Sequence, residues 1–206
     1  MKRLLIILSL ILLGFGFVGF IAGALIATGV VKYNGELPLG DVQGFVVDTT
    51  GTIYIASGGY GTIQSYSPAG KFLRQWSARA NGGSFSVGLN EQQQVVAYTV
   101  RDPRKLVFAP DGKLISESEM KIDIMAQGKS PNSIEANNAR YELEGGLFPR
   151  ITRTTSSTTT IVDQPLYLDL IKSPMPAWLL FAIGLVSNMI LRKDELLAKL
   201  HGQRAS

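Results

Sequence analysis

Two long apolar stretches flank a central region in which apolar and polar residues alternate over short runs. The first stretch runs from Leu4 to Val31 without an ionisable side chain. A helix of that length, rising about 1.5 Å per residue, can cross a bilayer core of about 30 Å. The second stretch, Met175 to Leu191, is close to the shortest length that spans a membrane, about 17 residues. The pattern predicts a mainly β domain between two apolar helices.

Each apolar stretch has an alternative interpretation. A cleaved signal peptide usually has an apolar core of about 7–15 residues, so the longer first stretch favours an uncleaved signal-anchor. The second stretch could instead form a buried or interfacial helix. Trp178 near its start, with Arg192 and Lys193 after its end, is typical of membrane interfaces and favours a second span.

Basic residues near the two stretches predict their orientation. They precede the first stretch and follow the second: Lys2, Arg3, Arg192, Lys193, Lys199 and Arg204. Positive residues stay on the cytoplasmic side, so we expect a double-pass protein of the cell (plasma) membrane with both termini cytoplasmic. The expected segments are a cytoplasmic N-terminus at 1–3, a first transmembrane helix at 4–31, an extracytoplasmic domain at 32–173, a second transmembrane helix at 174–191 and a cytoplasmic tail at 192–206. The tail is expected to lie on the inner leaflet as an amphipathic helix, or to continue the second span.

Charge and cysteine content narrow the class of protein. Basic and acidic residues balance within 32–173, so the net charge of +4 belongs to the membrane flanks and indicates topology, not nucleic-acid binding. The chain has no cysteine and no Asn-x-Ser/Thr sequon. An extracytoplasmic domain without disulfides must be held by core packing, which fits a bacterial surface protein.

The central region repeats itself after 42 residues, the distance from Pro68 to Pro110. The repeat superimposes the turn "SPAGK" on "APDGK", and the apolar Ile53 on Val95. Each unit alternates apolar and polar residues as half-buried strands do, and glycine and proline supply the turns. A period of about 40–45 residues with four strands is typical of a propeller blade.

Three units of about four antiparallel strands are predicted, at about 41–78, 83–120 and 130–165. The third unit is weaker, because a Ser/Thr-rich run, "TSST", stands where the others have "SPAG" and "APDG". That run could be a disordered linker. Its β-branched residues and the flanking Ile151, Ile161 and Val162 favour a strand pair.

Residues 40–76, "GDVQGFVVDTTGTIYIASGGYGTIQSYSPAGKFLRQW", resemble an NHL-type β-propeller repeat. The resemblance is partial for 87–118 and faint for 137–164. It departs from the family at "GGYGT", where an Asp or Asn commonly precedes the next strand. Most members of this family are binding platforms and a minority are enzymes, so the resemblance implies a propeller-like fold and no particular ligand.

Three blades do not close a ring, because propellers usually have about 4–8. Other protein subunits or a second copy of the chain are therefore expected to complete the propeller, and a symmetric dimer would supply six blades. The alternative is that the three sheets pack as a compact, non-propeller β domain.

Candidate catalytic chemistry is sparse. The only histidine is His201, on the tail, and this excludes Ser-His-Asp or Cys-His catalysis and His- or Cys-ligated zinc in the central domain. We therefore expect no enzyme, no catalytic residue, no cofactor and no metal. Scattered carboxylates are candidates for a calcium or acid/base site, with solvated loop roles favoured; they are Asp48, Asp111, Glu117, Glu119 and Asp123.

Candidate interaction residues lie in one loop and at two aromatic positions. Arg101, Arg104 and Lys105 form a basic patch in "VRDPRK" that could contact lipid headgroups, a partner or an acidic polymer; a solvated turn is the alternative. Tyr60 and Trp76 could line a binding face, although aromatics in strands are more often packing residues.

Small residues in the first apolar stretch predict helix packing. Gly19, Gly23 and Ala27 form a small-xxx-small stripe, with Gly16 close by, and the second stretch is the nearest candidate partner. The alternative is that glycine is simply common in membrane helices.

The predicted function is a non-catalytic, membrane-anchored interaction or assembly module, a subunit of a bacterial membrane or cell-surface complex. A membrane-tethered receptor that binds a small molecule or glycan at the blade ends is the alternative, and an enzyme is the least favoured. The expected partners are membrane lipid and other protein subunits or a second copy, and nucleic acid is not expected.

Overall fold

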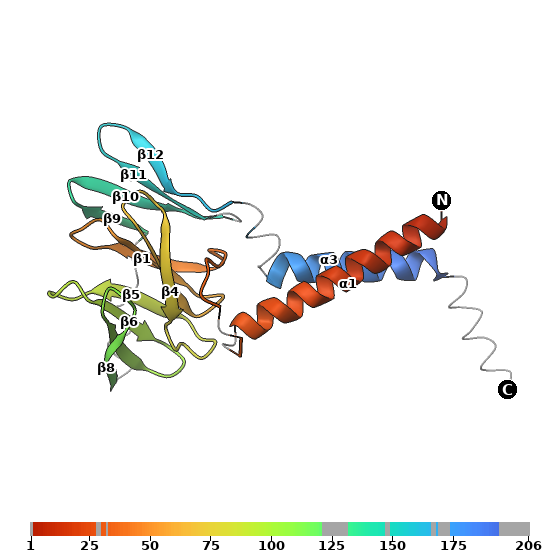
Figure 1. Cartoon of the computed structure of the whole chain (residues 1–206), viewed down its shortest axis with the longest axis horizontal. Coiled ribbons are helices and arrows are strands. Elements are labelled where there is room, and N and C mark those ends of the chain that lie inside the picture. The colour runs from red at the N-terminus through yellow and green to blue at the C-terminus, as the bar shows by residue number, and fades with distance from the viewer. Residues whose placement is uncertain are drawn as a thin grey trace. The chain divides into compact units, whose positions relative to one another are not determined.

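The computed structural model describes residues 2–27, 30–31, 33–120, 132–146, 149–165, 168 and 174–193. The chain divides into two compact units, Met1–Ala24 with Leu170–Ser206, and Leu25–Asp169. The first unit holds the two described helices and the second holds the sheets (Figure 1).

Two apolar helices were predicted, and both stretches are helical. They are α1 (Lys2–Ala27) and α3 (Pro174–Leu191). Within the described part of the chain, one helix is long and apolar enough to cross a membrane, over Lys2–Ile26; the apolar part of α3 is shorter. Length and composition therefore mark α1 as a candidate membrane span or signal-anchor, and they leave the predicted second span unsupported.

Among the residues that the structure describes, twelve strands form three four-stranded antiparallel sheets, each a meander in chain order. The first sheet consists of β1 (Val42–Val47), β2 (Ile53–Ser57), β3 (Thr62–Tyr66) and β4 (Phe72–Ser77). The second consists of β5 (Phe85–Leu89), β6 (Val95–Thr99), β7 (Arg104–Phe108) and β8 (Leu114–Glu119). The third consists of β9 (Ser133–Ala136), β10 (Ala139–Glu144), β11 (Arg150–Thr154) and β12 (Thr158–Val162).

This architecture confirms the predicted mainly β domain, which consists of three four-stranded antiparallel sheets in the described residues. One sheet lies within each of the three predicted units, and the Ser/Thr-rich run forms the β11–β12 turn and the start of β12. Residues 130–131 of the third predicted unit, Asp123, and tail residues 194–206 lie outside the described residues.

The sheets stack in the order third, first, second, so the first sheet is in the middle (Figure 1). One core cluster joins the first sheet to the second, through side chains such as Tyr54, Ile63 and Leu106. The other joins the first sheet to the third, through side chains such as Ile55, Tyr66 and Tyr141. Because both faces of the middle sheet are covered, all five residues of β2 are buried instead of every second one.

Successive sheets use equivalent faces. The first sheet meets the third through Phe45 and Ile53, and the second sheet meets the first through Val87 and Val95, the residues 42 positions later. The second sheet therefore packs on the first sheet in the same way as the first sheet packs on the third. This blade-like stacking is the regularity that the 42-residue repeat encodes.

The repeated glycine turns help to fix this stacking. Gly70 and Gly112 have φ of +75° and +86°, a region that favours glycine. A Cβ on Gly70 would overlap the carbonyl oxygen of Ile161 in β12, and a Cβ on Gly112 would lie 2.7 Å from the Trp76 ring in β4. Each turn therefore lies directly against the fourth strand of the preceding sheet in the stack.

Candidate functional site

The helix unit is built on a close approach of α1 and α3. A Cβ on Gly16 would lie 2.7 Å from the Ala177 carbonyl oxygen, and a Cβ on Gly184 would lie 2.8 Å from the Ser9 carbonyl oxygen. Only glycine permits these backbones to come so near, which is the way small residues act at membrane helix interfaces. The Asn188 side-chain amide also donates a 3.0 Å hydrogen bond to the Ser9 hydroxyl.

The predicted small-residue stripe takes part in this contact, but not at its centre. A Cβ on Gly19 would lie 3.1 Å from the Ala177 Cβ. Gly23 is buried, and the side chain of Ala27 lies outside the described residues. The closest approach is instead at Gly16 and at Gly184 in the second apolar stretch. Gly184 was missed, although a lone glycine in "FAIGLVSN" was the available signal.

One of the three residues of the predicted basic patch, Arg104, is neutralised by acidic neighbours. Arg104 forms ion pairs with Asp102, at 2.8 Å, and with Glu117. Glu117 also pairs with Arg79 from the loop before β5, at 3.0 Å. Arg101 is exposed and donates a hydrogen bond to the Asn81 carbonyl oxygen at 3.1 Å. Lys105 is exposed on β7, so Arg101 and Lys105 remain the accessible cations of the predicted patch.

Of the two predicted binding aromatics, Tyr60 is buried and Trp76 is half-buried. Tyr60 is 4% exposed. Trp76 packs between the first two sheets, with ring centroids 6.1 Å from Tyr54 and 6.1 Å from Phe108. Trp76 therefore packs between sheets, and a role of either ring at a binding face stays a prediction.

The candidate carboxylates do not converge. Asp48, which is 6% exposed, accepts hydrogen bonds from the Thr50 and Thr52 amides and from the Tyr54 hydroxyl, all within its own hairpin. Asp111 and Glu119 are exposed. Among the residues that the structure describes, no group of three or more His, Cys, Asp or Glu side chains could hold a metal ion.

A polar cluster at the chain ends of the β unit was not predicted. The Gln64 side chain, fully buried in β3, accepts from the Leu37 amide at 3.1 Å and donates to the Leu37 carbonyl at 3.0 Å. Gln164, just after β12, accepts from the Leu39 amide at 2.7 Å. Gln164 also donates to the Glu36 carboxylate at 2.9 Å. We call Glu36, Gln64, Tyr66 and Gln164 the end latch.

The end latch joins the segment before β1 to the segment after β12. The Tyr66 hydroxyl, buried between the first and third sheets, donates to Glu36 at 3.1 Å. Burial raises the pKa of this phenol above its ordinary value, and the Glu36 carboxylate raises it further. The only sequence signal was Gln64 itself, a polar residue where the repeat places the apolar Leu106. A single amide in a strand does not reveal its distant partner.

The fold thus defines a class: a mainly β domain of blade-like four-stranded sheets that follows an N-terminal apolar helix. No protein-family model matches the chain, and no curated protein sequence is similar to it. The predicted NHL family is therefore not shown.

Two solved structures of lyases resemble the chain in fold. One, described as a streptogramin B lyase structure, shares 13% identity at a TM-score of 0.36, over 66% of this chain and 44% of that one. The other, virginiamycin B lyase from Staphylococcus aureus, shares 15% identity at a TM-score of 0.26, over 62% of this chain and 59% of that one. The chain spans about half the length of these proteins.

The prediction that the chain is not an enzyme is contradicted by this comparison, because both similar structures are of lyases. The missing histidine and cysteine were the ground for that prediction. They exclude particular catalytic triads and zinc sites, and they do not exclude catalysis as such. We withdraw the prediction, and the similarity itself concerns the fold alone.

Proposed function

We propose that the chain is a membrane-anchored module that binds other protein chains on the outside of a cell membrane, through its β domain. In this proposal α1 and α3 both span the membrane, both termini are cytoplasmic, and the β unit is extracytoplasmic. The observation that carries the proposal is the helix pair, whose interior is tightly packed and whose exterior is apolar.

The exterior of the helix pair suits lipid. Large apolar side chains on α1 are exposed, including Leu4, Ile11 and Val18, and so are Trp178 and Ile190 on α3. An apolar surface of this extent is not normal for a protein in water and marks a membrane or protein contact. The glycine contacts and the Ser9–Asn188 hydrogen bond supply the interior that helix association in lipid requires. A helix of 18 residues is about 27 Å long, near the thickness of the bilayer core.

The arrangement of the sheets supports binding of a partner protein at the end of the stack that the second sheet forms. The third sheet turns a polar face outward, with ion pairs such as Arg140–Glu142 at 2.6 Å. The outward face of the second sheet corresponds, 42 residues earlier in the chain, to the face of the first sheet that is buried against the second sheet. Tyr98 and Val107 lie on it, and none of the described sheets covers it. A sheet from another chain would continue the same stacking relation there.

The partner in this proposal is another protein subunit, or a second copy, that extends the stack towards a propeller of the NHL kind. The outward face of the second sheet has Lys105 and Ser118 where the first sheet has Ile63 and Trp76. Those polar residues keep the face compatible with water while it is free, so the complex is expected to be reversible.

Cysteine labelling tests the membrane arrangement, because the natural chain has no cysteine. Ser156→Cys, in the exposed β11–β12 turn, should react with an impermeant maleimide in intact cells. Ser206→Cys, at the C-terminus, should react only after the membrane is opened. Labelling of both positions in intact cells would refute the second span, and labelling of neither would refute an outward β unit.

Native mass spectrometry of the full-length protein in detergent, before and after crosslinking in the membrane, tests the assembly role. A discrete dimer or a mass that includes a foreign subunit is expected, and Val107→Glu on the second sheet should abolish it. Thr160→Glu, on the outward face of the third sheet, is the matched control. A stable monomer in every case, or a complex that survives Val107→Glu, would refute binding at this face.

The alternative of a small-molecule or glycan receptor gains no support from a described site. Aromatics and carboxylates gathered on one rim of the sheets would favour it. Tyr54 and Trp76 are instead packed between sheets, and Asp48 is engaged by its own hairpin.

A further inference from the structure

We propose that the helix pair carries a binding site for an anionic phospholipid, at the end where α1 begins and α3 ends. One acyl chain would occupy a groove between the helices, and the phosphate would contact the basic residues that border it. The proposal rests on the membrane insertion proposed above, and it names a ligand class that insertion alone does not require.

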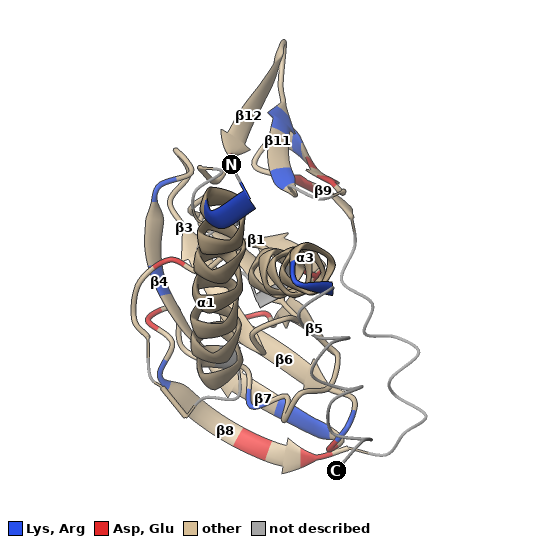
Figure 2. Ribbon diagram, turned by 90° about the vertical axis from the view of Figure 1, so that its right-hand side faces the viewer, with Lys and Arg blue, Asp and Glu red and all other residues tan. Residues whose placement is uncertain are grey.

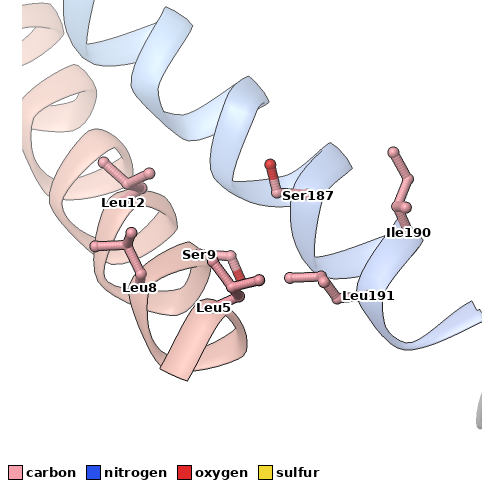
Figure 3. A pocket seen from close by; sticks show the side chains of 7 residues that line it. All are labelled: Leu5, Leu8, Ser9, Leu12, Ser187, Ile190 and Leu191. Carbon is pink, nitrogen blue, oxygen red and sulfur yellow. The ribbon is translucent and has the colours of Figure 1, made fainter. Parts of the chain in front are cut away.

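The groove has a volume of about 300 Å³, at the lower end of the range for ligand sites. Figure 3 shows side chains from both helices around it. Its lining residues are mainly aliphatic: Leu5, Leu8, Ser9, Leu12, Ser187, Ile190 and Leu191. A whole helix, about 10 Å across, is too wide to enter a groove of this volume, whereas a single hydrocarbon chain is narrow enough.

The Ser9 hydroxyl beside the groove has its hydrogen-bonding partners within the helices. The Ser9 hydroxyl donates to the Ile6 carbonyl at 2.8 Å and accepts from the Asn188 amide at 3.0 Å. Ser9 is only 2% exposed. Since this hydroxyl is already paired within the helices, an apolar ligand leaves no buried donor unsatisfied there.

Basic residues stand at the same end of both helices. Lys2 and Arg3 begin α1, and Arg192 and Lys193 follow the end of α3 (Figure 2). Lys2, Leu5 and Ser9 are spaced by three and four residues, which places them along one helix face. The described residues of both helices include no acidic side chain; Asp194 and Glu195 follow in the sequence and lie outside the described residues.

This combination favours an anionic over a neutral lipid. Basic residues near a membrane surface attract anionic headgroups by about 1 kcal/mol each, and basic pockets between membrane helices bind such headgroups. A neutral lipid could fill the groove but would gain little from the cations. Preference for an anionic headgroup is therefore the property that separates this site from general lipid contact.

The test uses the full-length protein in detergent, titrated with phosphatidylglycerol or phosphatidylcholine of identical acyl chains, with bound lipid counted by native mass spectrometry. We expect one lipid to bind with a clear preference for phosphatidylglycerol. Ser187→Phe should fill the groove and remove that lipid. Val186→Phe, on an exposed position of the same helix, should leave binding unchanged.

A separate variant tests the contribution of the basic residues to lipid binding. Lys193→Gln should reduce the preference for phosphatidylglycerol about fivefold, which corresponds to about 1 kcal/mol. Equal binding of both lipids, or equal loss in Ser187→Phe and Val186→Phe, would overturn the inference. The cysteine-labelling experiment reports insertion independently, so a protein that is inserted but unselective would refute this site and leave the proposed function intact.

Discussion

Three glycine turns with positive φ permit a graded test of the sheet stacking. Gly61 lies between β2 and β3, whereas Gly70 and Gly112 lie between the third and fourth strands of their sheets. Gly61→Ala introduces a side chain at φ +58°, with the nearest neighbour, the Ala80 Cβ, at an ordinary 3.9 Å. It should lower the free energy of unfolding by about 1–2 kcal/mol, the cost of a left-handed conformation alone. Gly112→Ala adds a 2.7 Å contact with the Trp76 ring, and such overpacking costs about 1–3 kcal/mol more.

Gly70→Ala should be the most damaging member of the series. Its Cβ would overlap the carbonyl oxygen of Ile161 and lie 2.6 Å from the carbonyl carbon. A backbone carbonyl in a paired strand has no rotamer by which to move away, whereas a ring can tilt. The turn must therefore separate from β12, and the expected loss exceeds about 4 kcal/mol, much of the stability of an ordinary domain.

Trp76 provides the assay, because it lies between the first and second sheets. In a Trp178→Phe background it is the only tryptophan, so its fluorescence reports unfolding of the β unit in urea. The full-length protein in detergent is used for every variant, and Gly145→Ala, with open space around its Cβ, is the control. A Gly70→Ala protein no less stable than Gly61→Ala would show that the turn does not contact β12 as described.

Three further predictions concern the helix pair and the end latch. Gly184→Leu should separate α1 from α3 and abolish a disulfide engineered between Gly19 and Ala177 as cysteines, because a Cβ on Gly19 would lie 3.1 Å from the Ala177 Cβ in the close approach. Gly14→Leu, with open space at its Cβ, should leave that disulfide intact, and equal crosslinking in both variants would contradict the close approach. Gln164→Ala leaves the Leu39 amide without its side-chain acceptor and removes one donor to the Glu36 carboxylate, which keeps the Tyr66 hydroxyl. The free energy of unfolding should therefore fall by about 1–3 kcal/mol, and a change below about 0.5 kcal/mol, the size of an ordinary surface substitution, would refute the latch. The folded-state pKa of Tyr66 is raised above the unfolded value of about 10, so the stabilising contribution of this phenol is complete below a pH of about 10 and is lost as the pH rises further. In the natural protein the urea midpoint should therefore fall between a pH of about 9 and 11, and Tyr66→Phe should make this fall less steep. An unchanged slope in the variant would contradict the burial of this phenol.

Local patterns predicted the β unit well because its strands follow a regular repeat. Turn residues such as Gly70 and Gly112 mark where strands end, and alternating apolar residues mark which side chains face a neighbour. Both signals depend on residues a few positions apart, so one chain suffices to read them. The third sheet was predicted despite its weak turn signal, because β-branched residues surround the Ser/Thr-rich run.

The stacking order and the interaction residues depended on contacts that no local pattern records. Tyr60 and Trp76 were expected at a binding face, since aromatics serve both packing and recognition and only the neighbouring sheet decides between them. Arg104 was expected to be an available cation. Its neutralisation by Glu117 comes from pairing of β7 with β8, a register that the sequence of the loop alone does not contain.

The stacking order also explains why an end latch can exist. If the sheets were stacked in chain order, the segment before β1 and the segment after β12 would lie at opposite ends, with the second sheet between them. Because the third sheet packs on the free side of the first, the Leu39 amide and the Gln164 side chain come within 2.7 Å. The double-pass arrangement that we propose needs the two outer ends of the β unit to lie close together. The non-sequential stacking meets that need, and the glutamines of the latch then hold the two ends at fixed positions on the first sheet.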